Sequence, residues 1–434
     1  MRVLFVPLAA PAHLALMVPT AWALRTAGHD VRFAVPPNHV ASVLEAGLIA
    51  VPFGTEVDLG DSDEAHEGDD GGWDLSELAG LDAPDTARGL RVREYAMGAV
   101  AAYCGLELLR PTLDELVALT RDWGPELVVW DHLAFHGSVA ARAAGAASAR
   151  SMIGVDHVRT MRTEYLRRVG TAAGAGSGGG PDDAVAGLLA ETLERYGAPG
   201  YDERMLFGDW SLNPVPEVVP APPGLTVVPF RQLPFAPPTP APEWLAKAPG
   251  REGGRICLTL GRSVRDVRKN DNYGISVSDL FEGLAGLDVE VVATLTRDQL
   301  PAGGTVAVPD NVLLTDYVPF DALLPTCSAV IHHGGLGTLM AAAAAAVPQI
   351  VVPSDGWDEA ELGVAVADRG AGLRLGGAAE LTPGELRAAT LRVLDDPAFA
   401  RGAAGLRDAM LGQPAPNDIV PVLERLTEAH RSRR

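Results

Sequence analysis

The feature that most constrains the fold is a strand–helix alternation that runs through the sequence twice. In the first part, brief runs of β-branched and bulky apolar residues are predicted strands, at 3–6, 31–35 and 127–130. Stretches with apolar residues at three- and four-residue spacing are predicted helices, at 13–27, 40–46, 93–115 and 137–144. Strands that alternate with helices form a parallel sheet covered by helices.

The alternation restarts after a proline-rich stretch. Residues 214–249 hold 12 prolines, which cannot donate in a sheet ladder and which break helices, so an extended linker is expected. Beyond it lie predicted strands at 256–260, 289–295, 312–314, 329–332 and 349–352. Predicted helices follow them, at 277–286, 321–326, 338–346, 359–369 and 385–394.

The predicted fold class is therefore α/β, with two Rossmann-like domains whose parallel sheets face each other across a cleft. Residues 1–213 form the first domain, 214–249 the linker and 250–434 the second domain, and the last helix is expected to pack back on the first domain. Ligands of such folds bind beyond the carboxyl ends of the strands, so the cleft is the expected binding site.

Charge and composition exclude several classes of protein. The net charge of −21, with 35 basic and 56 acidic residues, argues against binding to a nucleic acid backbone. No apolar run is long enough for a membrane span. Cys104, Cys257 and Cys327 lie too far apart for a disulfide framework or a zinc site, and the first residues lack a signal-peptide pattern, so a reducing cytoplasm is expected. Residues 56–85, with 12 acidic residues, and the glycine-rich 170–181 are predicted flexible inserts.

The sharpest local signal is HHGGLGT at 332–338, between a predicted strand and a helix. Glycines let the backbone approach a ligand, and the first N–H groups of the helix attract an anion. Thr338 is placed to cap the helix or to donate to a phosphate, and His333 to donate to a second phosphate. A capped turn without a ligand remains the alternative. A nicotinamide cofactor is not indicated, because the first predicted turn, LAAPAH at 8–13, lacks the G-x-G-x-x-G pattern.

The sequence resembles, from end to end, the GT-B glycosyltransferases that attach deoxysugars to polyketide and macrolide antibiotics. The segments that carry the resemblance are MRVLF at 1–5, VP at 18–19, AGH at 27–29, LTLG at 258–261, DNV at 310–312, ALLPTC at 322–327, HHGGLG at 332–337 and PSDGWD at 353–358. The resemblance implies an inverting transferase that uses a nucleoside diphosphate sugar, most often a dTDP-deoxysugar, with no cofactor and no metal.

The resemblance also implies the catalytic residues. His13 stands where similar enzymes have the general base that takes the proton of the acceptor hydroxyl, a role that suits an imidazole titrating near neutrality. Asp131 is the candidate carboxylate that orients this imidazole, although it could instead cap the following helix. His332 is either part of the phosphate site or a buried residue at the strand end.

Donor-binding roles are implied for residues of the second half. His333, with the glycines and threonine of its turn, would hold the diphosphate, and a glycine and a serine after the predicted strand 256–260 would face it. Trp357 could pack on the sugar or anchor its loop, and Glu359 stands where relatives have Gln. The implied donor residues are Gly261, Ser263, Val318, Leu323, His333, Gly335, Gly337, Thr338, Trp357, Asp358 and Glu359.

A hydrophobic acceptor pocket is expected in the first domain. Each candidate lining residue could equally belong to the core: Met17, Trp73, Met97, Tyr103, Phe135 and Met152. The macrolide branch often depends on an auxiliary protein that resembles a cytochrome P-450, so such a partner is expected here, as is a homodimer. Two alternatives to a transferase are a nucleotide-sugar epimerase or hydrolase of the same fold, and a non-catalytic relative that binds the donor as a scaffold.

Overall fold

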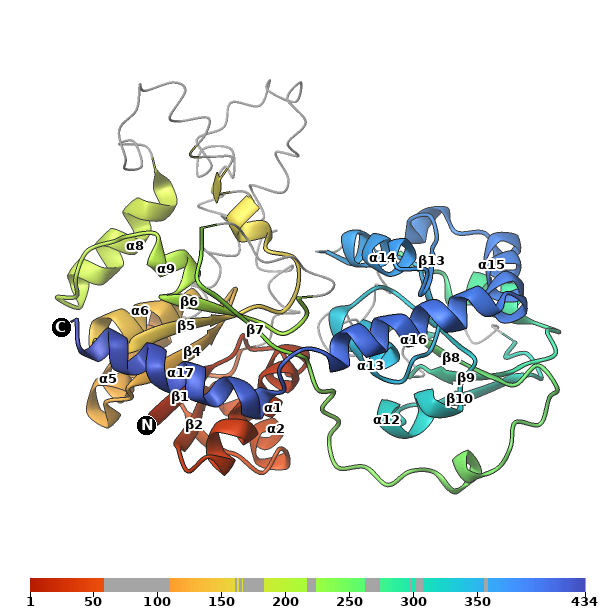
Figure 1. Ribbon diagram of the computed structural model, residues 1–434, viewed down its shortest axis with the longest axis horizontal. Coiled ribbons are helices and arrows are strands. Elements are labelled where there is room, and N and C mark those ends of the chain that lie inside the picture. The colour runs from red at the N-terminus through yellow and green to blue at the C-terminus, as the bar shows by residue number, and fades with distance from the viewer. Residues whose placement is uncertain are drawn as a thin grey trace.

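The computed structural model describes residues 1–57, 110–160, 162–163, 166, 183–216, 224–261, 274–296, 299–300, 307–354 and 358–433. Two parallel sheets, each covered by helices on both faces, form two domains that lie side by side (Figure 1). The predicted α/β fold is therefore confirmed. Most of the acidic insert and the whole glycine-rich insert lie outside the described residues.

The sheet of the first domain is entirely parallel and has the strand order β3-β2-β1-β4-β5-β6-β7. Its strands are β1 (Arg2–Val6), β2 (Asp30–Val35), β3 (Ile49–Pro52), β4 (Leu127–Asp131), β5 (Ala147–Ser151), β6 (Trp210–Asn213) and β7 (Val227–Pro229). The chain order reverses between β1 and β4, which pair from Val3↔Leu127 to Val6↔Trp130. The crevice of such a sheet lies beyond the carboxyl ends of these two strands.

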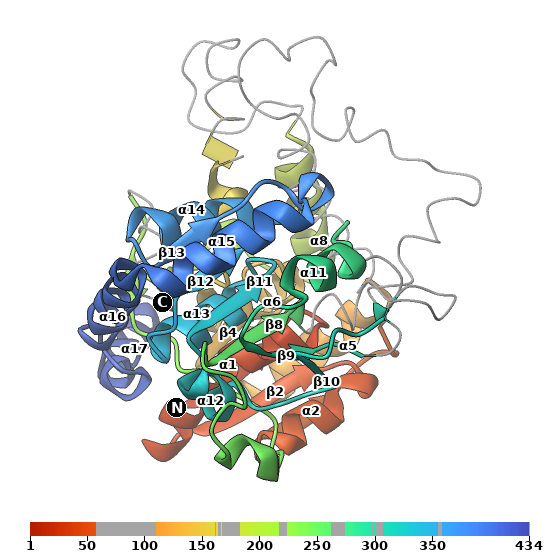
Figure 2. The ribbon, with the colours of Figure 1, turned by 90° about the vertical axis from the view of Figure 1, so that its right-hand side faces the viewer.

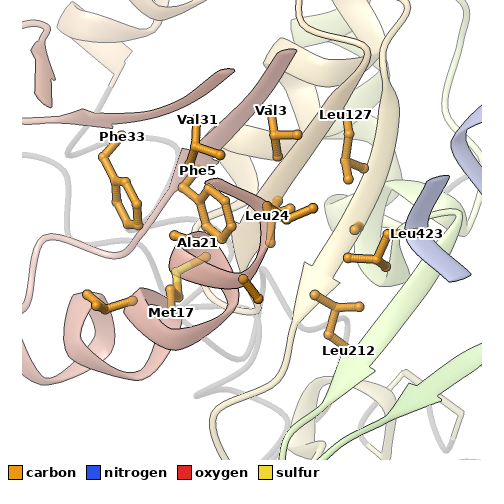
Figure 3. Packing of buried hydrophobic residues seen from close by; sticks show 14 of the residues in the cluster. Val3, Phe5, Met17, Ala21, Leu24, Val31, Phe33, Leu127, Leu212 and Leu423 are labelled. Carbon is orange, nitrogen blue, oxygen red and sulfur yellow. The ribbon is translucent and has the colours of Figure 1, made fainter. Parts of the chain in front are cut away.

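Two hydrophobic cores sandwich this sheet. One face packs on α1 (Pro11–Thr26), α2 (Val40–Glu45) and α17 (Pro416–Arg431). The other face packs on α5 (Arg110–Trp123), α6 (Phe135–Ala144), α8 (Ala184–Arg195) and α9 (Arg204–Phe207). Figure 3 shows side chains of β1, α1 and α17 meeting in the first of these cores.

The second domain repeats the arrangement, with the strand order β10-β9-β8-β11-β12-β13. Its strands are β8 (Arg255–Thr259), β9 (Glu290–Thr294), β10 (Val312–Thr315), β11 (Ala329–His332), β12 (Gln349–Val351) and β13 (Gly372–Arg374). One face packs on α11 (Val277–Leu284) and α15 (Pro383–Asp395), the other on α12 (Phe320–Leu323) and α13 (Leu336–Ala344) (Figure 2). The order reverses between β8 and β11, so each domain opens a crevice at the equivalent place.

The domains are joined by more than one segment. Met152 and Val215 of the first domain are buried in one cluster with residues of α13, α14 (Glu359–Asp368) and α16 (Pro397–Leu411). After α16 the chain crosses back, and α17 lies across the first domain, with Leu423 fully buried against it (Figure 1).

The structure departs from several of the sequence-based elements, among them the predicted linker and the predicted helix 93–115. The predicted linker contributes β7, which pairs with β6 through Ser211↔Val227, and its Phe230 is buried in the first core. The first domain therefore extends beyond residue 213. Helix α5 ends at Trp123 rather than at 115, because Leu116 and Val117 continue its buried face.

No described helix is long and apolar enough to cross a membrane.

Candidate active site

His13 and Asp131 meet at the crevice of the first sheet. His13 is the third residue of α1, which begins just beyond β1, and Asp131 is the last residue of β4. The His13 Nδ1 lies 2.8 Å from Asp131 Oδ2, and the backbone N–H of Leu133 donates to Oδ1 at 3.0 Å. The Asp131 side chain is fully buried, whereas 21% of the His13 side chain is exposed. Of this pair, only the His13 imidazole is therefore exposed at the crevice.

The attraction between His13 and Asp131 favours the charged form of both groups, although both are largely buried. Burial alone would favour the neutral form of both groups. The Asp131 carboxylate and its hydrogen bond outweigh burial and raise the pKa of His13 above 6.5, and His13 in turn lowers the pKa of Asp131. An ionised carboxylate only accepts hydrogen bonds, so in the neutral form of His13 the proton is on Nδ1 and Nε2 carries the lone pair. This is the tautomer of a general base.

His132 is a second histidine at this carboxylate. Its Nδ1 lies 3.6 Å from Asp131 Oδ1, and its ring is nearly parallel to that of His13, with the centroids 6.4 Å apart. Burial lowers the pKa of His132 to about 4, against the attraction of Asp131, so the ring is neutral near pH 7. This residue was not predicted from the sequence, although its position next to Asp131 was a usable signal.

The HHGG turn separates the roles of its two histidines. The buried His332 has Nε2 at 2.9 Å from Gln349 Oε1, and its Nδ1 accepts the Gly334 N–H at 3.1 Å. Burial lowers the pKa of His332 to about 4. Both ring nitrogens are thus used within the second domain, and of the two alternatives for His332 the structure supports the buried strand-end residue.

His333 instead lines the interdomain cavity. Burial, followed by the neighbouring His332, lowers its pKa to about 3, so the neutral ring offers one N–H. A Cβ atom at Gly261 would lie 2.6 Å from His333 Cε1, and one at Gly335 would lie 2.5 Å from Nε2. Glycine at both positions therefore makes room for this ring, and Gly261 also has φ of +75°.

The first turn of α13 borders the same cavity. Gly335 caps the helix, and its first three residues, Leu336, Gly337 and Thr338, all line the cavity. The helix begins two residues before the predicted start at 338. Its first N–H groups have no partner within the helix and carry the positive end of the dipole, which makes this end attractive to an anion.

The cavity lies between the domains and has a volume of about 380 Å³. The predicted site residues that line it come from both domains: His13, Gly261, Val318, His333, Gly335, Gly337, Thr338, Asp358 and Glu359. Asp131 lies behind His13. The His13–Asp131 pair and the anion-attracting turn therefore open into one space.

Asp358 connects the two sides of this cavity. It is the N-cap residue of α14, and its Oδ2 accepts a hydrogen bond from the backbone N–H of Val155, in the first domain, at 2.8 Å. Burial raises the pKa of Asp358 to about 7, although the Val155 bond acts in the opposite direction. The Asp358 charge also contributes to the raised pKa of His13.

Several predicted pocket residues lie in hydrophobic cores instead. Leu323 is fully buried against Val292 and Val330, while Val318 from the same region does reach the cavity. Met17 points into the core of the first domain (Figure 3), Phe135 packs in the opposite core, and Met152 is buried at the domain junction. None of these four residues lines the cavity: Leu323, Met17, Phe135 and Met152. On α1 the Met17 side chain faces the sheet, whereas the neighbouring Leu16 lines the cavity, and Phe135 of α6 likewise packs against the sheet. The remaining predicted residues lie outside the described residues: Ser263, Trp357, Trp73, Met97 and Tyr103.

Other lining residues were missed because no motif marks them. Thr259 and Thr294 end strands β8 and β9, and Gln232 and Phe235 come from the proline-rich segment, which was expected only to connect the domains. Within the described ranges, no group of three or more His, Cys, Asp or Glu side chains is arranged to hold a metal ion.

Comparison with known proteins agrees with this geometry. The models for the two domains of erythromycin biosynthesis protein CIII-like proteins match residues 22–261 and 278–426. Aclacinomycin-T 2-deoxy-L-fucose transferase of Streptomyces galilaeus is 40% identical over 99% of this chain and 97% of its own length. Tylactone mycaminosyltransferase of Streptomyces fradiae is 40% identical over 100% of this chain and 94% of its own length.

Solved structures agree as well. The glycosyltransferase VinC in complex with dTDP is similar with a TM-score of 0.80 and 33% identity, over 99% of this chain and 100% of that one. Spinosyn forosaminyltransferase SpnP has a TM-score of 0.78 and 35% identity, over 99% of both chains. Because both domain models match in order and the similarity runs the length of the chain, this protein belongs to the erythromycin biosynthesis protein CIII-like family of GT-B glycosyltransferases.

Proposed function

We propose that this glycosyltransferase moves a deoxysugar from a dTDP-sugar to a hydroxyl group of a polyketide aglycone of the macrolide or anthracycline type, with inversion at the anomeric carbon. One observation carries the proposal. The His13–Asp131 pair and the N-terminus of α13 with His333 open into the same interdomain cavity. A base for the acceptor and a site for the leaving diphosphate are the two parts that a single displacement needs.

His13 would act as the general base. Its Nε2 takes the proton of the acceptor hydroxyl while the acceptor oxygen attacks the anomeric carbon and the bond to the dTDP oxygen breaks. Asp131 fixes the tautomer and stabilises the imidazolium that forms, because its carboxylate is buried and bonded to Nδ1. Attack from the side opposite the leaving group inverts the anomeric configuration.

The diphosphate would bind at the first turn of α13. The backbone N–H groups there, the Thr338 hydroxyl and the neutral His333 ring supply donors for the negative charge that grows on the leaving group. In this proposal these donors take the role that a metal ion has in other transferases, so transfer continues when divalent ions are chelated. The thymine would lie near Val318 and Tyr317, and the dTDP of the VinC structure supports this choice of nucleotide.

The two substrates would meet near Asp358. Asp358 and Glu359 line the cavity and would accept hydrogen bonds from the hydroxyl groups of the donor sugar. Apolar residues of the first domain and the proline-rich segment face them and would bind the aglycone: Leu16, Leu133, Ile153 and Phe235. The names of the relatives, a 2-deoxy-L-fucose transferase and a tylactone mycaminosyltransferase, support substrates of this kind.

Family membership supports three further parts of the proposal. The enzyme would work in the cytoplasm, where dTDP-sugars and polyketide aglycones are made. A cytochrome P-450-like auxiliary protein would assist it, and two copies of the chain would associate as a homodimer.

Ligand-induced thermal stabilisation tests the donor, followed by a transfer assay. With dTDP, UDP, GDP and NAD at equal concentration, dTDP should raise the Tm most, because a ligand stabilises the folded state according to its affinity. The protein with a dTDP-deoxysugar and a macrolactone or anthracyclinone should then give a glycoside whose yield EDTA does not change. A preference for NAD, or release of free sugar without glycoside, would contradict the proposal.

A further inference from the structure

A segment of the first domain reaches into the donor side of the cavity. It follows β5 and includes Gly154 and Val155. The Val155 N–H donates to Asp358 Oδ2 at 2.8 Å, although the two residues are 203 positions apart in the sequence. Asp358 lines the cavity next to the start of α14. A backbone group of the acceptor domain therefore holds a carboxylate of the donor domain.

The approach of this segment requires glycine at position 154. A Cβ atom at Gly154 would lie 1.9 Å from Asp358 Oδ2 and 3.0 Å from its Cγ, and the first distance is far inside van der Waals contact. Gly154 is not among the glycines with positive φ, so its backbone conformation is open to other residues. Glycine at position 154 therefore leaves room for the Asp358 carboxylate, and the local backbone conformation does not require it.

Packing fixes this segment from both sides. The backbone N–H of Met152 donates to Leu212 O of β6 at 3.0 Å, which ties the segment to the first sheet. The Met152 side chain is buried at the domain junction, in one cluster with Leu336 of α13 and Leu362 of α14. Val155 packs against the same cluster. The segment is therefore held by the first sheet on one side and by the second domain on the other.

We propose that Gly154 and Val155 form a positioning element of the donor-sugar site, which orients Asp358 from across the domain boundary. This inference rests on the proposed role of Asp358 in binding donor hydroxyl groups. The Val155 N–H holds Oδ2 and leaves Oδ1 to accept a hydrogen bond from the sugar. The sugar is then bound well only when the domains are together, whereas the nucleotide, which the second domain holds alone, is bound in either arrangement.

The substitution Gly154→Ala tests this element, with Gly200→Ala as the matched control, because a Cβ at Gly200 has no neighbour within 4 Å. Binding of dTDP and of a panel of dTDP-6-deoxyhexoses is measured by calorimetry without acceptor. In Gly154→Ala the affinity for the panel member that wild type binds best should fall about ten-fold or more, because a displacement near 1 Å is costly at such a site. The affinity for dTDP should stay unchanged, and Gly200→Ala should match wild type for both ligands.

A double-mutant cycle with Asp358→Ala separates positioning from general damage. The Asp358→Ala variant has no carboxylate with which a new methyl group at position 154 could collide, so adding Gly154→Ala to that variant should cause no further loss. An equal loss in both backgrounds, or a parallel loss of dTDP affinity in Gly154→Ala, would overturn the inference. If wild type binds dTDP-sugars and Gly154→Ala binds them equally well, only the inference fails. If wild type binds neither dTDP nor any dTDP-sugar, the proposed function fails as well.

Discussion

The substitution Asp131→Asn is the sharpest test of the catalytic pair, because the structure fixes how the new amide must sit. Leu133 N–H donates to Oδ1 at 3.0 Å, so the amide oxygen has to occupy this side. The amide NH₂ then faces His13 Nδ1, at the present Oδ2 position. Because NH₂ is a donor, Nδ1 becomes the acceptor and the proton moves to Nε2. The base would then be protonated on the side that faces the cavity.

The size of the effect follows from two contributions. Restoring the reactive tautomer requires the amide to turn and leave a buried donor unpaired, which costs about 1–3 kcal/mol, or about one to two powers of ten. Loss of the carboxylate charge also lowers the pKa of His13, so the imidazole becomes a weaker base and the rate falls further. Because a positioned general base typically contributes about 10²- to 10⁴-fold, the kcat of Asp131→Asn should fall by a factor in this range.

The assay is kcat with both substrates saturating, alongside an unrelated Asp–His pair as control. Asp209 Oδ2 lies 3.1 Å from His430 Nδ1 and accepts the Ser148 N–H, but it does not line the cavity. Asp209→Asn should lower the Tm and leave kcat unchanged. A kcat for Asp131→Asn within about three-fold of wild type would refute the base assignment.

Two further substitutions test the donor side. His333→Ala should weaken dTDP binding about ten-fold, through loss of an N–H donor to the phosphates, and equal affinity by calorimetry would contradict this role. Asp358→Asn should change how stability depends on pH, since the folded pKa of Asp358 is raised from 3.8 to about 7. Between these values the folded state binds more protons than the unfolded state, so wild type loses stability as the pH rises and the Asn variant does not share this loss. The difference in free energy of unfolding, Asp358→Asn minus wild type, should therefore increase by roughly 2–3 kcal/mol between about pH 5 and about pH 8. Urea unfolding of both proteins at the two pH values measures this difference. The same difference at both pH values would rule the prediction out.

The strands at the centre of both sheets and the edge strand β10 were predicted from the sequence, whereas β3, β5, β6, β7 and β13 were not. Central strands such as β1 and β4 are buried on both faces and consist of continuous apolar runs. Strand β5 reads Ala-Ser-Ala-Arg-Ser and gives no such signal, although its Arg150 is fully buried. Arg150 is tolerated there because it pairs with Asp156 and donates to Ser211. A local sequence pattern does not show which residues will pair with Arg150 in the folded protein.

The site shows the same contrast. His13 and Asp131 were singled out by the resemblance to the glycosyltransferases and His333 by its glycine-rich turn, and the structure places each of them just beyond a strand at a crevice. The acceptor residues could not be placed, because an apolar side chain such as Met17 serves a core and a pocket equally well. The Val155–Asp358 contact was also beyond sequence reasoning, since a backbone N–H has no residue signature.

The return of the chain to its first domain has a consequence for exchanging donor specificity between relatives. Helix α16 packs with the second domain, but α17 completes the core of the first, where Ile419 and Leu423 are buried. The two segments that cross between the domains, the proline-rich segment and the link from α16 to α17, are hydrogen-bonded to each other, since the Arg231 N–H donates to Pro414 O at 2.9 Å. A chimera cut once in the proline-rich segment would bring a foreign α17 against the native α1. A second junction, between α16 and α17, would keep each core with its own side chains and transfer only the half that contains the proposed diphosphate site.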